Sequence, residues 1–193
     1  MDIQNRISGS AGNPDIYFDY IYSQGQDTAQ NIKIPYPVIF FMYSGKLTIK
    51  CKNKKISVEK GECVFLQANT TATFQTKDCD NESFCGIYIG FNKPFLSEFY
   101  NNCYNKKSLP EKDKIPADIM KMPCTPYMQS LYISMIPYLE RKIKPEKNVM
   151  ELKRMECIYC MLTSDPRFYT SLFDFIKPIE LNLFYIINKN NLN

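Results

Sequence analysis

The sequence predicts an α+β fold, in which a β-barrel or jelly roll is followed by a helical segment of about three helices. Two observations lead to this prediction. Short apolar runs with two-residue spacing, separated by turn residues, occupy the first half of the chain, and apolar residues at spacings of three and four occupy the second half. We therefore expect five parts: a flexible N-terminus (1–14), a barrel (15–92), a connector (93–124), a helical dimerisation and linker segment (125–187) and a frayed tail (188–193).

The clearest strand pattern is a hairpin in the lysine-rich stretch that follows Gly45. Leu47, Ile49 and Cys51 occupy every second position and polar residues fill the others, which is the period of a strand with one wet face. Asn53 separates this run from the next one, and asparagine tolerates the left-handed backbone of short hairpin loops. Further strands are expected at 17–22, 38–43, 56–58, 63–66, 72–76 and 84–91. Seven short strands with turns between them favour a closed or double-sheet architecture.

Two of these segments carry additional information. The run 38–43 is apolar at every position, so we expect it to be covered on both faces. Gly45 and Gly61 stand at the ends of runs and are placed in turns.

The second half of the chain reads as helical after an irregular connector. The stretch 101–123 is polar, lysine-rich and broken by three prolines, with a short helix expected before it at 94–100. Thr125 and Pro126 form a typical helix start, and Pro137 is expected to kink that helix. A second helix is expected at 149–162 and a third after Asp165. Their apolar stripes are Met128, Leu131, Met135 and Leu139; Leu152, Met155, Tyr159 and Leu162; and Phe168, Leu172, Phe173 and Ile176.

Composition argues against several functions. The chain has no histidine, whereas metal-dependent enzymes with this kind of barrel use two or three histidines around the ion, and nucleophilic catalysis usually needs a histidine base. We therefore expect no catalysis, no metal and no cofactor. Neither a signal peptide nor an apolar run of about 18 residues is evident, so we expect a cytoplasmic protein without membrane contact.

Cysteine and lysine each leave two interpretations open. Cys157 and Cys160 share a helix face and could form a redox or metal pair, but a single such pair lacks the four ligands of structural zinc, and all eight cysteines could simply be buried apolar residues. The lysines of the hairpin could bind nucleic acid. They lack interleaved aromatic residues, however, and lysines on an exposed strand more often keep an edge soluble.

Three segments together resemble a known family. They are 59–66 (EKGECVFL), 151–162 (ELKRMECIYCML) and 168–178, which contains Leu172, Phe173 and Pro178. In order and spacing they are similar to the N-terminal regulatory half of AraC-family transcription regulators, above all those of Bacteroidetes. The chain departs from that pattern at Gln67, near which the family tends to carry a proline. It also ends at Asn193, where the two helix-turn-helix motifs would begin.

The resemblance implies a cupin-like barrel that senses an effector and helices that form a dimer contact. For a small-molecule effector, aromatic and apolar residues expected to face inward are the candidate ligand site: Phe41, Tyr43, Leu47, Ile49 and Tyr88. For a homodimer, the candidate contacts are Met128, Leu131, Met135, Leu139, Leu152, Met155 and Tyr159. Plain core packing is the alternative for both sets. DNA would be reached only through a C-terminal domain absent here; the other interpretation is a stand-alone cupin-like binding protein, or a truncated regulator acting by heterodimerisation.

Overall fold

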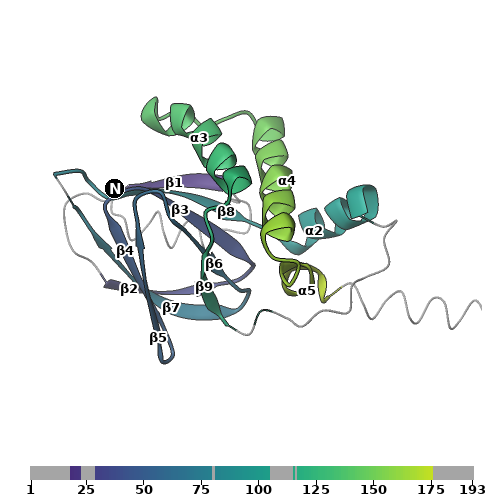
Figure 1. Ribbon diagram of the computed structural model, residues 1–193, viewed down its shortest axis with the longest axis horizontal. Coiled ribbons are helices and arrows are strands. Elements are labelled where there is room, and N and C mark those ends of the chain that lie inside the picture. The colour runs from purple at the N-terminus through teal and green to yellow at the C-terminus, as the bar shows by residue number, and fades with distance from the viewer. Residues whose placement is uncertain (1–17, 23–28, 80, 105–114, 116, 176–193) are drawn as a thin grey trace, which may run out of the picture.

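The computed structural model describes residues 18–22, 29–79, 81–104, 115 and 117–175, which form two stacked antiparallel sheets with helices on one side (Figure 1). We call the five-stranded sheet next to the helices the helix-side sheet. Its order is β1 (Phe18–Tyr22), β8 (Cys85–Gly90), β3 (Val38–Ser44), β6 (Cys63–Leu66) and β9 (Ile119–Met122). We call the four-stranded sheet the outer sheet. Its order is β2 (Ala29–Ile34), β7 (Thr70–Lys77), β4 (Lys46–Cys51) and β5 (Lys54–Glu59).

The described helices follow the strands in the chain, apart from β9. They are α2 (Lys93–Phe99), the π-helical turn η1 (Tyr100–Tyr104), α3 (Pro126–Glu140), α4 (Lys147–Ser164) and α5 (Phe168–Phe173). Figure 1 shows α3, α4, α2 and α5 on the same side of the molecule as the helix-side sheet, with β5, β7 and β2 away from them. No described helix is long and apolar enough to cross a membrane.

Strand alternation divides the helix-side sheet between two cores. Phe40, Val64 and Tyr88 point into the space between the sheets, whereas Phe41 and Phe65 point toward the helices. Because β3 lies in the middle of its sheet and is buried on both faces, the prediction for its continuous apolar run is confirmed. Predicted and observed strands agree at the other six positions too.

The turns agree with the sequence in two places and differ in one. Gly45 and Gly61 have positive φ angles of 76° and 82°, which only glycine adopts without strain. In the hairpin between β4 and β5, Cys51 faces Lys54, and the left-handed residue is Lys52, with φ 52°. The expectation that Asn53 would supply this conformation is wrong, because the two-residue loop puts its positive φ at the first central position.

Two described strands were not predicted. β2 alternates buried and exposed residues but contains only two large apolar side chains, so its signal is weak. β9 lies within the stretch expected to be an irregular connector, yet it pairs with β6 from Ile119 opposite Leu66 to Met122 opposite Cys63. The side-chain amide of Gln67 secures this strand by donating to the carbonyls of Ile115 and Ala117, at 2.9 and 3.2 Å.

The helical predictions are correct in number and order for the described residues. The Thr125 hydroxyl accepts a hydrogen bond from the Met128 amide at 3.3 Å, so Thr125 caps α3 as expected, and Pro137 lies inside that helix. In α4 the buried residues are Arg154, Cys157, Ile158, Cys160 and Met161, so the predicted stripe is not its core-facing side. α5 ends at Phe173, and the predicted continuation to Ile176 lies outside the described residues, as do the predicted N-terminal and C-terminal tails.

Candidate functional sites

The first candidate site is the space between the two sheets. Leu47, Ile49 and Tyr88 face it, as predicted for three of the five ligand-site residues. The space is filled by side chains: the cavity left beside Leu47, Phe74 and Tyr88 measures about 20 Å³. That volume holds about one water molecule and no organic ligand.

The other two predicted ligand-site residues face the helices, which corrects the prediction that they point inward. The ring of Phe41 stacks on Tyr132 of α3 with the centroids 5.8 Å apart. The hydroxyl of Tyr43 donates a 2.8 Å hydrogen bond to Glu140 Oε1 at the end of α3, and this bond raises the pKa of Tyr43. Because side chains alternate along a strand, Phe41 and Tyr43 lie on the opposite face of β3 from the inward Phe40 and Met42.

Two polar side-chain atoms that face the interior from the outer sheet are buried without a hydrogen-bond partner among the described residues. They are Nε2 of Gln30 on β2 and Oγ1 of Thr76 on β7. Both residues lie on the inward face of their strands, because Gln30 is two residues from the inward-facing Ile32 and Thr76 is two residues from the inward-facing Phe74. An unsatisfied buried donor or acceptor costs about 1–3 kcal/mol, so these atoms mark a place where the interior could gain a polar ligand atom.

A second cavity, of about 230 Å³, lies where the sheets meet α2 and α5. Tyr36, Phe91, Leu96 and Leu172 contribute to its apolar wall, and Lys93 and Asp174 contribute charged groups. The sequence did not predict this second cavity, because it is lined by residues from elements that are distant in the chain.

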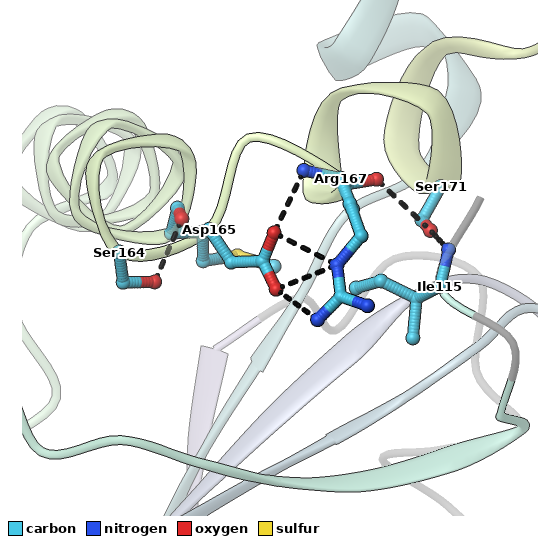
Figure 2. A network of polar contacts seen from close by, with 6 residues as sticks. Ile115, Ser164, Asp165, Arg167 and Ser171 are labelled. Carbon is cyan, nitrogen blue, oxygen red and sulfur yellow. Dashed lines mark hydrogen bonds and ion pairs between the residues drawn. The ribbon is translucent and has the colours of Figure 1, made fainter. Parts of the chain in front are cut away.

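Polar contacts at the turn between α4 and α5 (Figure 2) hold helix α5 in place, and Ser171 and Leu172 of that helix line the second cavity. The carboxylate of Asp165 accepts hydrogen bonds from the backbone amide of Arg167 at 2.9 Å and from its guanidinium at 2.7–3.1 Å. The hydroxyl of Ser171 accepts from the amide of Ile115 at 3.3 Å and donates to the carbonyl of Arg167 at 3.4 Å. Helix α5 is thereby tied both to α4 and to the segment that leads into β9.

The predicted dimer residues of α3 are buried within the protomer. Met128, Leu131, Met135 and Leu139 are at most 3% exposed and belong to the core shared by the helices and the helix-side sheet. Their stripe is therefore the core-facing side of α3, and the expectation that they contact a second subunit is corrected by this burial.

The predicted dimer residues of α4 lie on its outer side. Leu152 is 63% exposed and Tyr159 is 45% exposed, with Met155 half-buried between them. The rings of Tyr159 and of Phe99 in α2 form a T-shaped pair with a centroid distance of 5.1 Å. We call Leu152, Met155 and Tyr159 the outer stripe of α4. An exposed apolar stripe of this kind on a helix is a candidate docking surface.

Opposite the outer stripe, Arg154 joins α4 to the end of the barrel. It is 5% exposed, its Nε donates to the Gly90 carbonyl at 3.0 Å, and its Nη2 donates to Asn92 Oδ1 at 3.1 Å. Its guanidinium lies 3.7 Å from the centroid of the Phe95 ring. A residue of α4 thus contacts the last residue of β8, Asn92 before α2 and the ring of Phe95 within α2. The helical pattern did not reveal this residue, because arginine is rarely buried.

The cysteines behave as apolar core residues where they are buried. Burial raises the pKa of Cys63 and of Cys85 to about 12 and that of Cys160 to about 11, and it also raises the pKa of Cys157 well above its ordinary value. These thiols are protonated at neutral pH and so poorly reactive, which favours the packing interpretation of Cys157 and Cys160 over the redox one. The described residues contain no group of three or more metal-ligating side chains close enough to hold an ion.

Comparison with known proteins identifies the class. The family model of the ExsA N-terminal regulatory domain matches residues 37–170, so the chain belongs to this family. It is a regulatory N-terminal domain of AraC type with a cupin-like α+β fold. The resemblance to the N-terminal regulatory half of AraC-family regulators is therefore confirmed. No curated protein sequence matches the chain.

Three solved structures illustrate the similarity. Apo ToxT from Vibrio cholerae is 14% identical with a TM-score of 0.58, over 81% of this chain and 57% of that one. ToxT from V. cholerae O395, bound to (E)-4-(8-methylnaphthalen-1-yl)but-3-enoic acid, is 15% identical with a TM-score of 0.49, over 77% and 66%. The ethanolamine utilization protein EutQ from Salmonella typhimurium is 15% identical with a TM-score of 0.33, over 39% and 58%. The first of these similarities shows a shared fold, and this chain spans little more than half of that ToxT chain.

Proposed function

We propose that this regulatory domain works by pairing with a second copy through the outer stripe of α4. The observation that carries the proposal is the contrast between the space between the sheets and the outer stripe of α4. The space between the sheets is filled, whereas Leu152 and Tyr159 leave large apolar surfaces in solvent. Burying apolar surface contributes about 25 cal/mol of free energy for each square ångström. In this conformation, a partner that covers the outer stripe of α4 therefore gains more free energy than a ligand in the filled space between the sheets.

The geometry of α4 suits a symmetric contact between two copies. The outer stripe has spacings of three and four residues, which is the seam period of paired helices. At about 1.5 Å per residue, the 18 residues of α4 span roughly 27 Å, long enough for several interlocking layers. The Lys153–Glu156 ion pair at 2.9 Å and the Lys147–Glu151 pair at 4.0 Å lie in the same helix. In a two-fold dimer each copy presents the same stripe.

The test is sedimentation velocity of the chain over a range of concentrations, with Leu152→Glu as the interface variant. Because Leu152 is mostly exposed, the substitution leaves the protomer core intact, and a buried charge in the seam should weaken the dimer by about 100-fold or more. Ile133→Glu is the matched control, since Ile133 is an exposed apolar residue, 55% accessible, on the neighbouring helix α3. A chain that stays monomeric at high concentration, or an equal loss in both variants, contradicts the proposal.

We also propose that the barrel accepts a small-molecule effector when its interior expands, with Leu47, Ile49 and Tyr88 as walls. The supporting observation is the pair of buried atoms, Gln30 Nε2 and Thr76 Oγ1, that lack partners among the described residues. An effector bound there would select a minor, expanded state and so shift the population between two arrangements of barrel and helices. Arg154 would pass the change from β8 to α4.

The effector proposal is tested by thermal unfolding with a library of small amphipathic metabolites. A ligand present at 100 times its dissociation constant should stabilise the domain by about 2.7 kcal/mol. Thr76→Val should reduce this shift by removing the polar partner while keeping the volume, and Thr71→Val, on the exposed face of the same strand, should not. A library without any stabilising compound argues against effector binding and leaves the dimer proposal intact. We further propose that the protein acts in the cytoplasm and that recognition of DNA bases belongs to a C-terminal domain outside this chain.

A further inference from the structure

The exposed face of the outer sheet gathers lysines from all four of its strands. Lys33 lies on β2, Lys77 on β7, Lys50 on β4 and Lys55 on β5, and all four are exposed. The strand registers place them on one surface. Lys50 is directly opposite both Lys55 and Thr73. Lys33 is opposite Thr71, which lies on the same face of β7 as Thr73 and Lys77. The sequence analysis placed Lys50 and Lys55 on a lysine-rich hairpin, and the sheet adds Lys33 of β2 and Lys77 of β7 to the same face.

This patch has little compensating negative charge. Glu59 is the acidic residue on the same face of β5, and it is already paired with Lys46 at 2.7 Å. Lys33, Lys50, Lys55 and Lys77 have no ion-pair partner among the described residues. Four positive charges therefore stand on one sheet face at neutral pH.

The residues between the lysines are polar and able to form hydrogen bonds. They are Asn31, Thr48, Thr71, Thr73 and Gln75. The described residues with large exposed apolar side chains all lie at positions 127–159, on the helical part of the chain. Within the described chain, the apolar core that contains the helices includes residues of the helix-side sheet and none of the outer sheet, and Figure 1 shows the described helices on the other side of the molecule.

We propose that this face binds the sugar-phosphate backbone of duplex DNA, independently of base sequence. Lysine, threonine, asparagine and glutamine side chains are among the groups that contact phosphate oxygens in protein–DNA complexes. Three strand spacings separate β2 from β5, which is roughly 14 Å and so comparable to the width of about 12 Å of the DNA major groove. Long lysine side chains on this surface can therefore reach phosphates on both sides of a groove.

The composition of the face favours duplex DNA over two other polyanions. Single-stranded nucleic acid is held largely by aromatic side chains that stack on bases, and the outward positions of these four strands contain none. Protein partners bind largely through tryptophan, tyrosine and arginine anchors, which are also missing from these outward positions. If a separate domain recognises the DNA sequence, this face would add non-specific affinity for duplex DNA and hold the regulatory domain against the duplex that the other domain binds.

The experiment measures fluorescence anisotropy of a labelled duplex of arbitrary sequence, titrated with the chain from low to physiological salt. Four lysine contacts predict a slope of about −3.6 for the logarithm of the binding constant against the logarithm of salt concentration. The variant Lys33→Gln/Lys50→Gln/Lys55→Gln should bring the slope to about −0.9 and weaken binding at low salt by about tenfold or more. The matched control is Lys142→Gln/Lys144→Gln/Lys147→Gln, which removes three exposed lysines near α4 and should leave the slope unchanged.

The outcomes separate the duplex proposal from its alternatives. Equal losses in the two triple variants, a slope near zero, or binding to single-stranded DNA or polyglutamate as tight as to the duplex would overturn it. Thermal unfolding confirms that each variant is folded; if the patch variant is not, Lys50→Gln alone should still reduce the slope by about 0.9. Sedimentation of the patch variant should show an unchanged association state, because the inference does not depend on pairing through α4.

Discussion

Replacing Arg154 with alanine should destabilise the domain by about 3 kcal/mol. Two hydrogen bonds from the charged guanidinium are lost, to Gly90 and Asn92, each worth about 1.5–3 kcal/mol. The stacking on Phe95 adds about 2 kcal/mol for a desolvated cation. Release of the buried charge returns several kcal/mol of desolvation cost and offsets part of the loss.

Urea unfolding followed by circular dichroism measures this difference. Arg154→Lys should fall between the native protein and the alanine variant, because lysine keeps the charge but cannot donate in two directions while stacking on a ring. Arg141→Ala, an exposed arginine at the end of α3, should change stability by about 0.5 kcal/mol or less. A loss below about 1 kcal/mol in Arg154→Ala would refute the reasoning that this residue connects the barrel to α4.

Three further predictions concern turns, thiol reactivity and pH. Gly45→Ala should cost clearly more stability than Gly61→Ala in urea unfolding, since both have positive φ but an added Cβ at Gly45 would lie 2.7 Å from the backbone of Phe84 and one at Gly61 meets nothing within 4 Å; equal costs would contradict this. In the native protein, the exposed Cys103 and Cys124 should react with a thiol reagent much faster than the buried cysteines, and rapid reaction of the buried thiols would contradict the packing. The pKa of Cys63 is raised by burial from 9.0 to about 12. Between these two pH values, the Cys63 thiol keeps its proton in the folded state and loses it in the unfolded state. Stability should be complete below pH 9 and fall as the pH rises toward 12, by up to about 1.4 kcal/mol per pH unit for each such thiol; Cys63→Val should reduce this slope, and an unchanged slope would exclude Cys63 as its source.

Much of the barrel was predictable because its signals are local. Leu47, Ile49 and Cys51 alternate with polar residues, and turn glycines bound the strands. β9 was missed because four residues between prolines carry no period of their own. They form a strand only because β6 offers a free edge.

Helix α4 shows that the spacing of apolar residues does not determine which side of a helix faces the core. Helix α4 carries apolar residues on two sides, so the outer stripe through Leu152 looked like a core face, while Arg154 lies on the true core face beside Cys157. A sequence pattern gives the spacing of a stripe but not the neighbour that covers it. The inward or outward direction of Phe41 was equally undetermined, because β3 is apolar on both faces.

The central claim is that the outer stripe of α4 meets its own counterpart in a second copy. A photo-reactive benzoylphenylalanine placed at position 152 tests it most directly, since Leu152 is exposed in the protomer and central to the proposed seam. After irradiation and mass spectrometry, we expect covalent dimers whose cross-links end in residues 147–164 of the partner copy. Cross-links confined to other surfaces, or an absence of covalent dimers at concentrations where the chain sediments as a dimer, would contradict the claim.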